Sequence, residues 1–202
     1  DGIHQTGNTQ GATPGTMKYK DLNGDGLIDD ANDRTVIGDS NPLHVGGFNN
    51  SFTMKNFTFS FFFQWSYGNE IFNAAKLRTN GLQPFMNITR DYYENAWTDQ
   101  NQSNIAPAFG KIDQVPSSYF VEDGSFLRLK TVNLSYDLPK EALKNSSISG
   151  VSLFLSANNL FTITKYTGFD PEVVSNNSLL PGFERFSYPR ARTITLGLTV
   201  KL

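Results

Sequence analysis

The sequence predicts an all-β fold of antiparallel strands, and three observations lead to that prediction. The stretch FTFSFFFQWSY at 57–67 places six aromatic side chains on one face and polar side chains, with Phe62 the exception, on the other. The stretch RTITLGLTVKL at 192–202 alternates aliphatic residues with Thr, Gly and Lys in the same way. The connections between strand-like segments are alternately short and long. Alternation of this length is typical of strands with one apolar face.

The chain order of the predicted elements follows from the same patterns. Five segments alternate as strands do: 45–54, 57–67, 126–136, 151–158 and 192–202. Lys55 and Asn56 separate the first two segments, which predicts a tight hairpin. In the long connection that follows, the spacing of apolar residues predicts short helices over 70–80 and 84–97, with Pro84 near the start of the second.

The apolar faces need a partner, and the loop lengths indicate a membrane. Outer-membrane barrels alternate short periplasmic turns with long extracellular loops, and strands of about 9–11 residues cross the hydrocarbon layer when tilted. On this interpretation 45–202 is a partial outer-membrane β-barrel with lipid against its aromatic face. The long segments 1–44, 68–125 and 159–190 are then extracellular. The alternative is a soluble, calcium-stabilised β-sandwich that binds carbohydrate, in which such strands pack on a core.

Composition excludes several function classes. The 202 residues carry 17 basic and 19 acidic side chains, and a net charge of −2 gives no electrostatic basis for binding nucleic acid. The absence of cysteine excludes disulfides and thiolate metal sites, and no run of about 18 apolar residues predicts a transmembrane helix. Asp170 and Glu172 flank Pro171, which favours a turn over an acid–base pair. With no catalytic motif, we expect that the protein is not an enzyme.

The sharpest local motif is DLNGDGLIDDAND, a stretch rich in oxygen ligands. Its candidate calcium ligands are Asp21, Asn23, Asp25, Leu27, Asp29 and Asp33. The first three match the opening ligands of an EF-hand loop, Gly26 matches its sharp turn, and Leu27 would offer its carbonyl. The closing acid of such a loop is replaced by Asn32, and Asp33 follows one place later. Two alternatives stay open: a structural Ca²⁺ that orders an extracellular loop, and a metal-free loop of Asx turns.

A longer pattern emerges when five stretches are taken in order over nearly the whole chain. They are PGTMKYKDLNGDGLIDDANDRTVIG (14–38), GGFNNSFTMKNFTFSFFFQWSYGNEIFNAAK (46–76), SFLRLKTVNLSYDLPKEAL (125–143), SANNLFTITKYTGFDPEV (156–173) and YPRARTITLGLTVKL (188–202). Together they resemble the C-terminal part of the SusC/RagA-like TonB-dependent outer-membrane transporters.

The resemblance implies a larger protein around this chain. It implies a barrel of about 22 strands with a plugged lumen, of which this chain supplies the last five strands. The plug and the segment that contacts the TonB complex would lie in an N-terminal region that this chain lacks. The resemblance further implies a SusD-like surface lipoprotein as partner, and import of oligosaccharides or peptides as the activity.

Three arginines lie close together in sequence before the last predicted strand: Arg185, Arg190 and Arg192. They could contact an anionic ligand, lipopolysaccharide phosphates or the lipoprotein partner. They could equally be anchors at the membrane interface.

Overall fold

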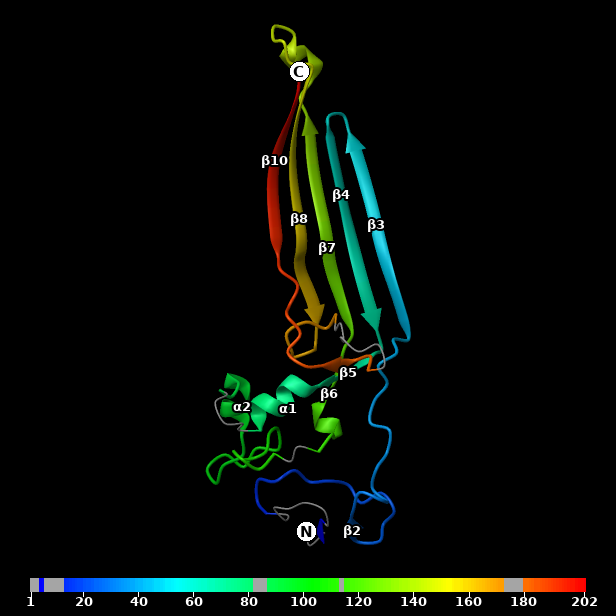
Figure 1. The fold of residues 1–202 in the computed structure, drawn as a ribbon, viewed down its shortest axis with the longest axis vertical. Helices are drawn as coiled ribbons and strands as arrows, with labels where there is room; N and C mark the ends of the chain where they lie inside the picture. The colour runs from blue at the N-terminus through cyan, green and yellow to red at the C-terminus, as the bar shows by residue number, and fades with distance from the viewer. Residues whose placement is uncertain (1–3, 6–12, 82–86, 113–114, 173–179) are drawn as a thin grey trace. The chain divides into compact units, whose positions relative to one another are not determined.

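The computed structural model describes residues 4–5, 13–81, 87–112, 115–172 and 180–202 (Figure 1). Its long strands form one five-stranded sheet in the order β10-β8-β7-β4-β3. The strands are β3 (His44–Met54), β4 (Phe57–Tyr67), β7 (Phe126–Asp137), β8 (Gly150–Thr164) and β10 (Thr193–Lys201). Every neighbouring pair is antiparallel, so the sheet is a meander that follows chain order. The predicted antiparallel all-β fold is confirmed.

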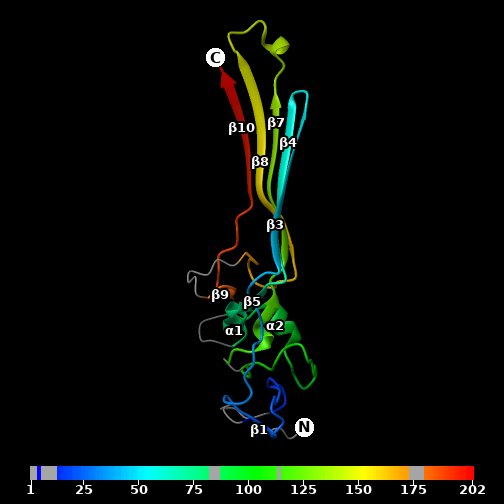
Figure 2. The ribbon, with the colours of Figure 1, turned by 90° about the vertical axis from the view of Figure 1, so that its right-hand side faces the viewer.

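The five strands form a single layer, as Figure 2 shows from a quarter turn away. Short connections join β3 to β4 and β7 to β8, and the latter contains the 3₁₀ turn η2 (Lys140–Leu143). Long connections join β4 to β7 and β8 to β10. The predicted hairpin forms at Lys55, whose φ of 52° places it in the left-handed region. One boundary was wrong: β8 continues to Thr164, because Phe161 and Ile163 pair with β7 beyond the predicted end.

The sheet has one apolar face and one polar face. Large apolar side chains on the first face are 38–77 % exposed: Phe48, Phe52, Met54, Phe57, Phe59, Leu134, Leu153, Leu155, Phe161, Ile163, Ile194, Leu196, Leu198 and Val200. Ring contacts run along it, with centroids 6.5 Å apart for Phe52 and Phe59 and 6.2 Å apart for Phe63 and Phe161. This face carries the apolar area that a soluble domain would bury.

Phe62, the exception in the alternation, points to the polar face and covers a glycine there. A Cβ on Gly47 would lie 2.7 Å from Cε2 of Phe62, closer than packing allows. Phe154 covers Gly197 on the same face in the same way, at 2.1 Å from a Cβ there. Each glycine therefore leaves the space that a ring on the neighbouring strand fills.

A β-bulge in β7 changes which side chains face which way. Across the bulge the strand register pairs Phe62 with Thr131 and Phe63 with Leu129. Lys130 is the extra residue, and the alternation shifts by one position at this point. Arg128 and Asn133 are an odd number of residues apart, so a regular strand would place them on opposite faces. The bulge places both on the polar face.

The chain divides into two compact units. We call Asp39–Ile71, Glu122–Gly182 and Ser187–Leu202 the sheet unit, and Asp1–Gly38, Phe72–Val121 and Phe183–Phe186 the loop unit. The short elements are β1 (His4–Gln5), β2 (Leu27–Ile28), β5 (Glu70–Asn73), α1 (Ala74–Asn80), α2 (Arg90–Asn95), η1 (Ser118–Phe120), β6 (Val121–Asp123) and β9 (Phe183–Glu184). Among the described residues no helix has the length and apolar character needed to cross a membrane.

The predicted helices are present but shorter than expected. The helix predicted over 70–80 begins only at α1, because the preceding EIFN forms β5 and Phe72 pairs with Phe183 of β9. Asn73 caps α1 by accepting a hydrogen bond from the N–H of Lys76. The helix predicted over 84–97 is reduced to α2, which Thr89 caps, and Pro84 lies outside the described residues.

The loop unit has a small core of its own. Its buried members are Met17, Tyr92, Ala96, Ala106, Ile112 and Phe120. Phe120 is fully buried, and the Tyr92 hydroxyl donates a hydrogen bond of 3.1 Å to the carbonyl of Ala108. Burial raises the pKa of Tyr92 to about 12, and the neighbouring Tyr119 acts in the same direction.

Candidate functional site

The predicted calcium loop folds as a series of turns closed by its own side chains. Asp21 accepts hydrogen bonds from the N–H groups of Gly24 and Gly26, at 2.6 and 2.8 Å. Both glycines have positive φ, at 76° and 83°, a conformation that glycine adopts without strain. Asp25 in turn accepts from the N–H of Leu27 at 2.8 Å. These bonds fix the first half of the motif as Asx turns.

The second half of the motif is closed by Asp29 and Asp33. The N–H groups of Asn32 and Ala31 donate to Asp29 and hold its pKa below the usual range. Asp33 accepts from the N–H of Leu22 and the N–H of Asp29, both at 2.7 Å, and so joins the two halves. Within the described part of the chain no group of three or more His, Cys, Asp or Glu side chains is placed to hold a metal. Calcium binding stays a prediction.

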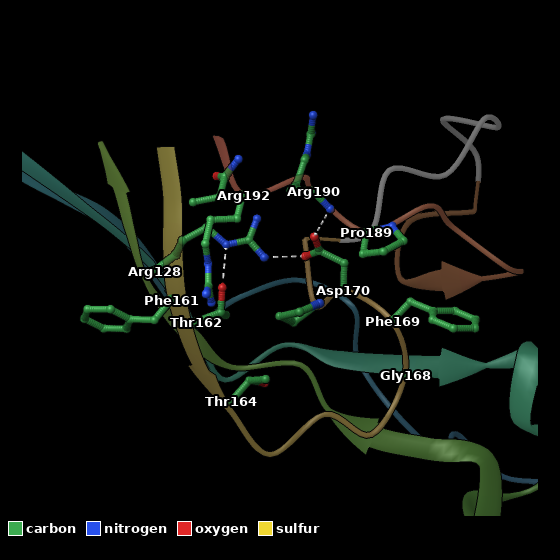
Figure 3. A pocket seen from close by; sticks show the side chains of 12 residues that line it. Arg128, Phe161, Thr162, Thr164, Gly168, Phe169, Asp170, Pro189, Arg190 and Arg192 are labelled. Carbon is green, nitrogen blue, oxygen red and sulfur yellow. Dashed lines mark hydrogen bonds and ion pairs between the residues drawn. The ribbon is translucent and has the colours of Figure 1, made fainter. Parts of the chain in front are cut away.

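A second cluster lies on the polar face of the sheet unit, around Arg128 of β7 (Figure 3). Its guanidinium lies 2.5 Å from Asp170 and 2.8 Å from Glu172, and its Nε donates to the hydroxyl of Thr162 at 2.8 Å. The side chains of Arg128 and Asp170 are 3 % and 5 % exposed. A buried guanidinium with two carboxylates satisfies its charge and its donors together, because the planar fork matches carboxylate geometry.

Further cations extend this cluster. Lys130 donates to Gln64 of β4 at 2.6 Å and lies 3.3 Å from Glu172. The guanidinium of Arg190 lies 3.7 Å from the same carboxylate. Arg128 and Lys130 are two residues apart in sequence, and both reach the polar face although Lys130 is the extra residue of the bulge.

Asp170 also fixes the backbone of two loop segments. It accepts hydrogen bonds from the N–H of Glu172 and from the N–H of Arg190, both at 2.9 Å. Burial alone would raise its pKa, but these N–H groups and the guanidinium of Arg128 outweigh burial and hold the pKa below the ordinary range. The turn predicted around Pro171 is therefore present, and the ion pairs that its carboxylates make were not predicted.

The comparisons with known proteins concern the whole chain. No family model matches it. Over 99 % of its length the chain is 37 % identical to TonB-dependent receptor P3 of Formosa agariphila, and over 92 % it is 36 % identical to TonB-dependent receptor P26 of the same organism. It is 28 % identical over 98 % of its length to TonB-dependent receptor SusC of Bacteroides thetaiotaomicron. The chain belongs to the SusC/RagA-like TonB-dependent receptors. It spans 19–21 % of the length of these three relatives.

Solved structures agree with this family assignment. The RagAB peptide importer in its open-open state superposes with a TM-score of 0.70 and 27 % identity, over 87 % of this chain and 19 % of that one. The closed-closed state of the same importer gives a TM-score of 0.68 and 26 % identity, over 86 % and 19 %. The resemblance inferred from the five ordered stretches is confirmed.

Within this SusC/RagA-like segment, sequence reasoning missed Arg128 and Lys130. A signal was present: FLRLKTV places two cations two residues apart on one face of a predicted strand, and DPE places two carboxylates at the same spacing. Nothing in the sequence indicated that Arg128 and Asp170, which are 42 residues apart, would be in contact.

Proposed function

We propose that this chain forms part of the wall of an outer-membrane transporter that imports oligosaccharides or peptides. The observation that carries the proposal is the single-layered sheet, whose aromatic and aliphatic face is exposed along its length while the opposite face is polar. A membrane barrel requires this distribution, with lipid on the apolar side and a polar lumen on the other.

The family relationship supports the rest of the proposal. Relatives named TonB-dependent receptors, and a structural neighbour named a peptide importer, favour import driven through the TonB complex. The region that contacts TonB would lie outside this chain. We include a SusD-like surface lipoprotein as partner, and residues 1–44 together with the long connections after β4 and β8 as extracellular surface.

The soluble sandwich finds no support in the fold. A sandwich buries its apolar faces between two sheets. In the part of the chain that the structure describes, the other sheets have two and three short strands.

We retain a structural Ca²⁺ in the loop at 21–33 as part of the proposal. Asp21, Asn23 and Asp25 lie in one short segment whose turns are held by hydrogen bonds to their side chains. Calorimetry on the intact transporter should detect Ca²⁺ binding that Asp25→Asn weakens. Binding that this substitution leaves unchanged, or the absence of binding, would remove calcium from the proposal.

The test of transport uses the full-length protein that contains this chain. Cells with and without its gene would be fractionated, and uptake of fluorescent oligosaccharides and fluorescent peptides measured. We expect the protein in the outer membrane, and uptake of one substrate class that requires the gene and stops when a protonophore collapses the energy source of TonB. A full-length protein that is soluble without detergent would overturn the proposal.

A further inference from the structure

The Arg128 cluster borders a cavity of about 440 Å³ in the sheet unit, and this cavity has an excess of positive charge. Its charged lining residues are Arg128, Asp170, Arg190 and Arg192. Glu172 pairs with Arg128 of this lining and Lys130 pairs with Glu172, which adds one charge of each sign. The segment VVSNNSL, which follows Glu172 in the sequence, contains no ionisable residue, so it adds no negative charge.

The cations of this cavity differ in how far their charge is already balanced. The charge of Arg128 is already balanced, because its guanidinium donates to two carboxylates and a hydroxyl. Arg190 has one distant partner, Glu172 at 3.7 Å, and its side chain is half exposed. Figure 3 shows the Arg190 side chain extending away from Asp170, to which only its backbone is bonded. Arg192 makes no hydrogen bond or ion pair with any residue that the structure describes.

The backbone that carries these two arginines is held in place. The N–H of Arg190 is bonded to Asp170 at 2.9 Å, and the side chain of Asn159 donates to the carbonyl of Ala191 at 3.0 Å. Asn159 has a φ of 51°, a left-handed conformation that asparagine tolerates better than most residues. Fixing the backbone before a ligand arrives lowers the entropy that binding costs.

We propose that this cavity binds an oxyanion of the transported substrate, with Arg192 as its principal donor and Arg190 as the second. Guanidinium groups recognise carboxylates and sulfate or phosphate esters through paired N–H donors. The buried Asp170–Arg128 pair acts as a positioning device, since it fixes the segment from which both donors extend. This inference rests on the proposed function only for the source of the anion.

The experiment measures binding rather than transport. The full-length transporter, purified in detergent, is titrated calorimetrically with glucuronate and with its neutral methyl ester. In a second arm it is titrated with trialanine and with trialanine amide, so the two arms distinguish an acidic sugar from a peptide C-terminus. We expect the charged member of one pair to bind at least tenfold more tightly, because only that member offers an oxyanion to the guanidinium donors.

Two variants and one control assign the effect to the cavity. Arg192→Gln should weaken binding of the charged ligand about tenfold, and Arg192→Lys should give an intermediate loss because lysine keeps charge but not the paired donors. Both should melt at the temperature of the unmodified transporter, because Arg192 makes no hydrogen bond or ion pair with the described residues that its removal would break. Arg185→Gln, exposed and outside the cavity, should change nothing.

The outcomes separate this inference from the proposed function. Equal binding of charged and neutral ligands in both arms, or unchanged binding in Arg192→Gln, would overturn the oxyanion site while leaving transport intact. If cells with and without the gene take up both substrate classes equally, while the purified protein still binds the charged ligand, the proposed function is contradicted and the oxyanion site is supported.

Discussion

The sheet unit and the loop unit use similar residues in opposite ways. In the loop unit, Phe120 and Tyr92 are almost completely buried in a small core. In the sheet unit, Phe48 and Phe52 of β3 are about half exposed. The first arrangement is that of a small domain in water, whose apolar side chains face inward. The second fits the apolar surrounding that we propose for the sheet. On that proposal water surrounds one unit and lipid the other, and the placement of the aromatic residues differs accordingly.

The largest expected loss of stability comes from the buried charges of the sheet unit, which have no counterpart in the exposed ion pair of the loop unit. Arg128→Gln leaves Asp170 and Glu172 without their main counter-charge, and loss of one partner of a buried pair costs about 3–5 kcal/mol. We expect a lower melting temperature of the full transporter and faster protease cleavage after β8. Arg90→Gln removes an exposed pair in the loop unit, 89 % and 53 % exposed, and should cost less than about 0.5 kcal/mol. Equal effects of the two substitutions would contradict the assigned burial.

The second prediction compares an aromatic residue in each unit. Phe61→Arg places a charge on the proposed lipid face near the middle of β4 and should cost about 2–4 kcal/mol. Tyr93→Arg in the loop unit, where the ring is 67 % exposed, should change stability by no more than about 0.5 kcal/mol. Heat-modifiable migration on gels measures assembly of both variants. Ser60→Arg, on the polar face beside Phe61, is the matched control and should assemble better than Phe61→Arg.

A third prediction concerns the polar face of the sheet. Gly47→Val would force the Phe62 ring from its place, and overpacking of this kind costs about 1–3 kcal/mol. The double substitution Gly47→Val with Phe62→Ala should recover part of the loss, because the added side chain then fills the space that the ring leaves. Melting temperatures of the two variants test this, and the absence of any recovery would mean that the ring does not cover the glycine.

The smallest expected effect is a pH dependence of the cluster. The folded pKa of Asp170 is lowered from the ordinary 3.8, so the stabilisation that it gives is complete above pH 3.8 and is lost as the pH falls through the lower folded value. Protease cleavage between β8 and β10 should therefore accelerate only in that acidic range. Asp170→Asn should remove this dependence. A transition already present near neutral pH would contradict the direction of the shift.

Much of the fold could be predicted because period-two alternation is a local property. It defined β3, β4 and β10 to within about a residue, a precision that local patterns reach when the alternation is strict. The end of β8 was missed because Asn158 and Asn159 resemble a loop start, whereas pairing with β7 continues the strand. The helices were overestimated because β5 and its pairing with β9 depend on residues more than 100 positions apart, at Phe72 and Phe183.

The candidate site was less predictable than the fold. The ligand types of the loop at 21–33 are visible in sequence because they are adjacent. The Arg128 cluster depends on a register shift and on a loop returning over the sheet, and neither leaves a local pattern.

The extra residue at Lys130 gives β7 a reading frame. Adding a second residue beside it would shift the alternation by one further position. Every side chain on the Arg128 side would then turn over: Leu127 and Leu129 to the polar face, and Arg128 to the face occupied by Phe63. A single added codon would thus act in space as a frameshift acts in a gene. It would move a charge onto the apolar face without substituting any other residue.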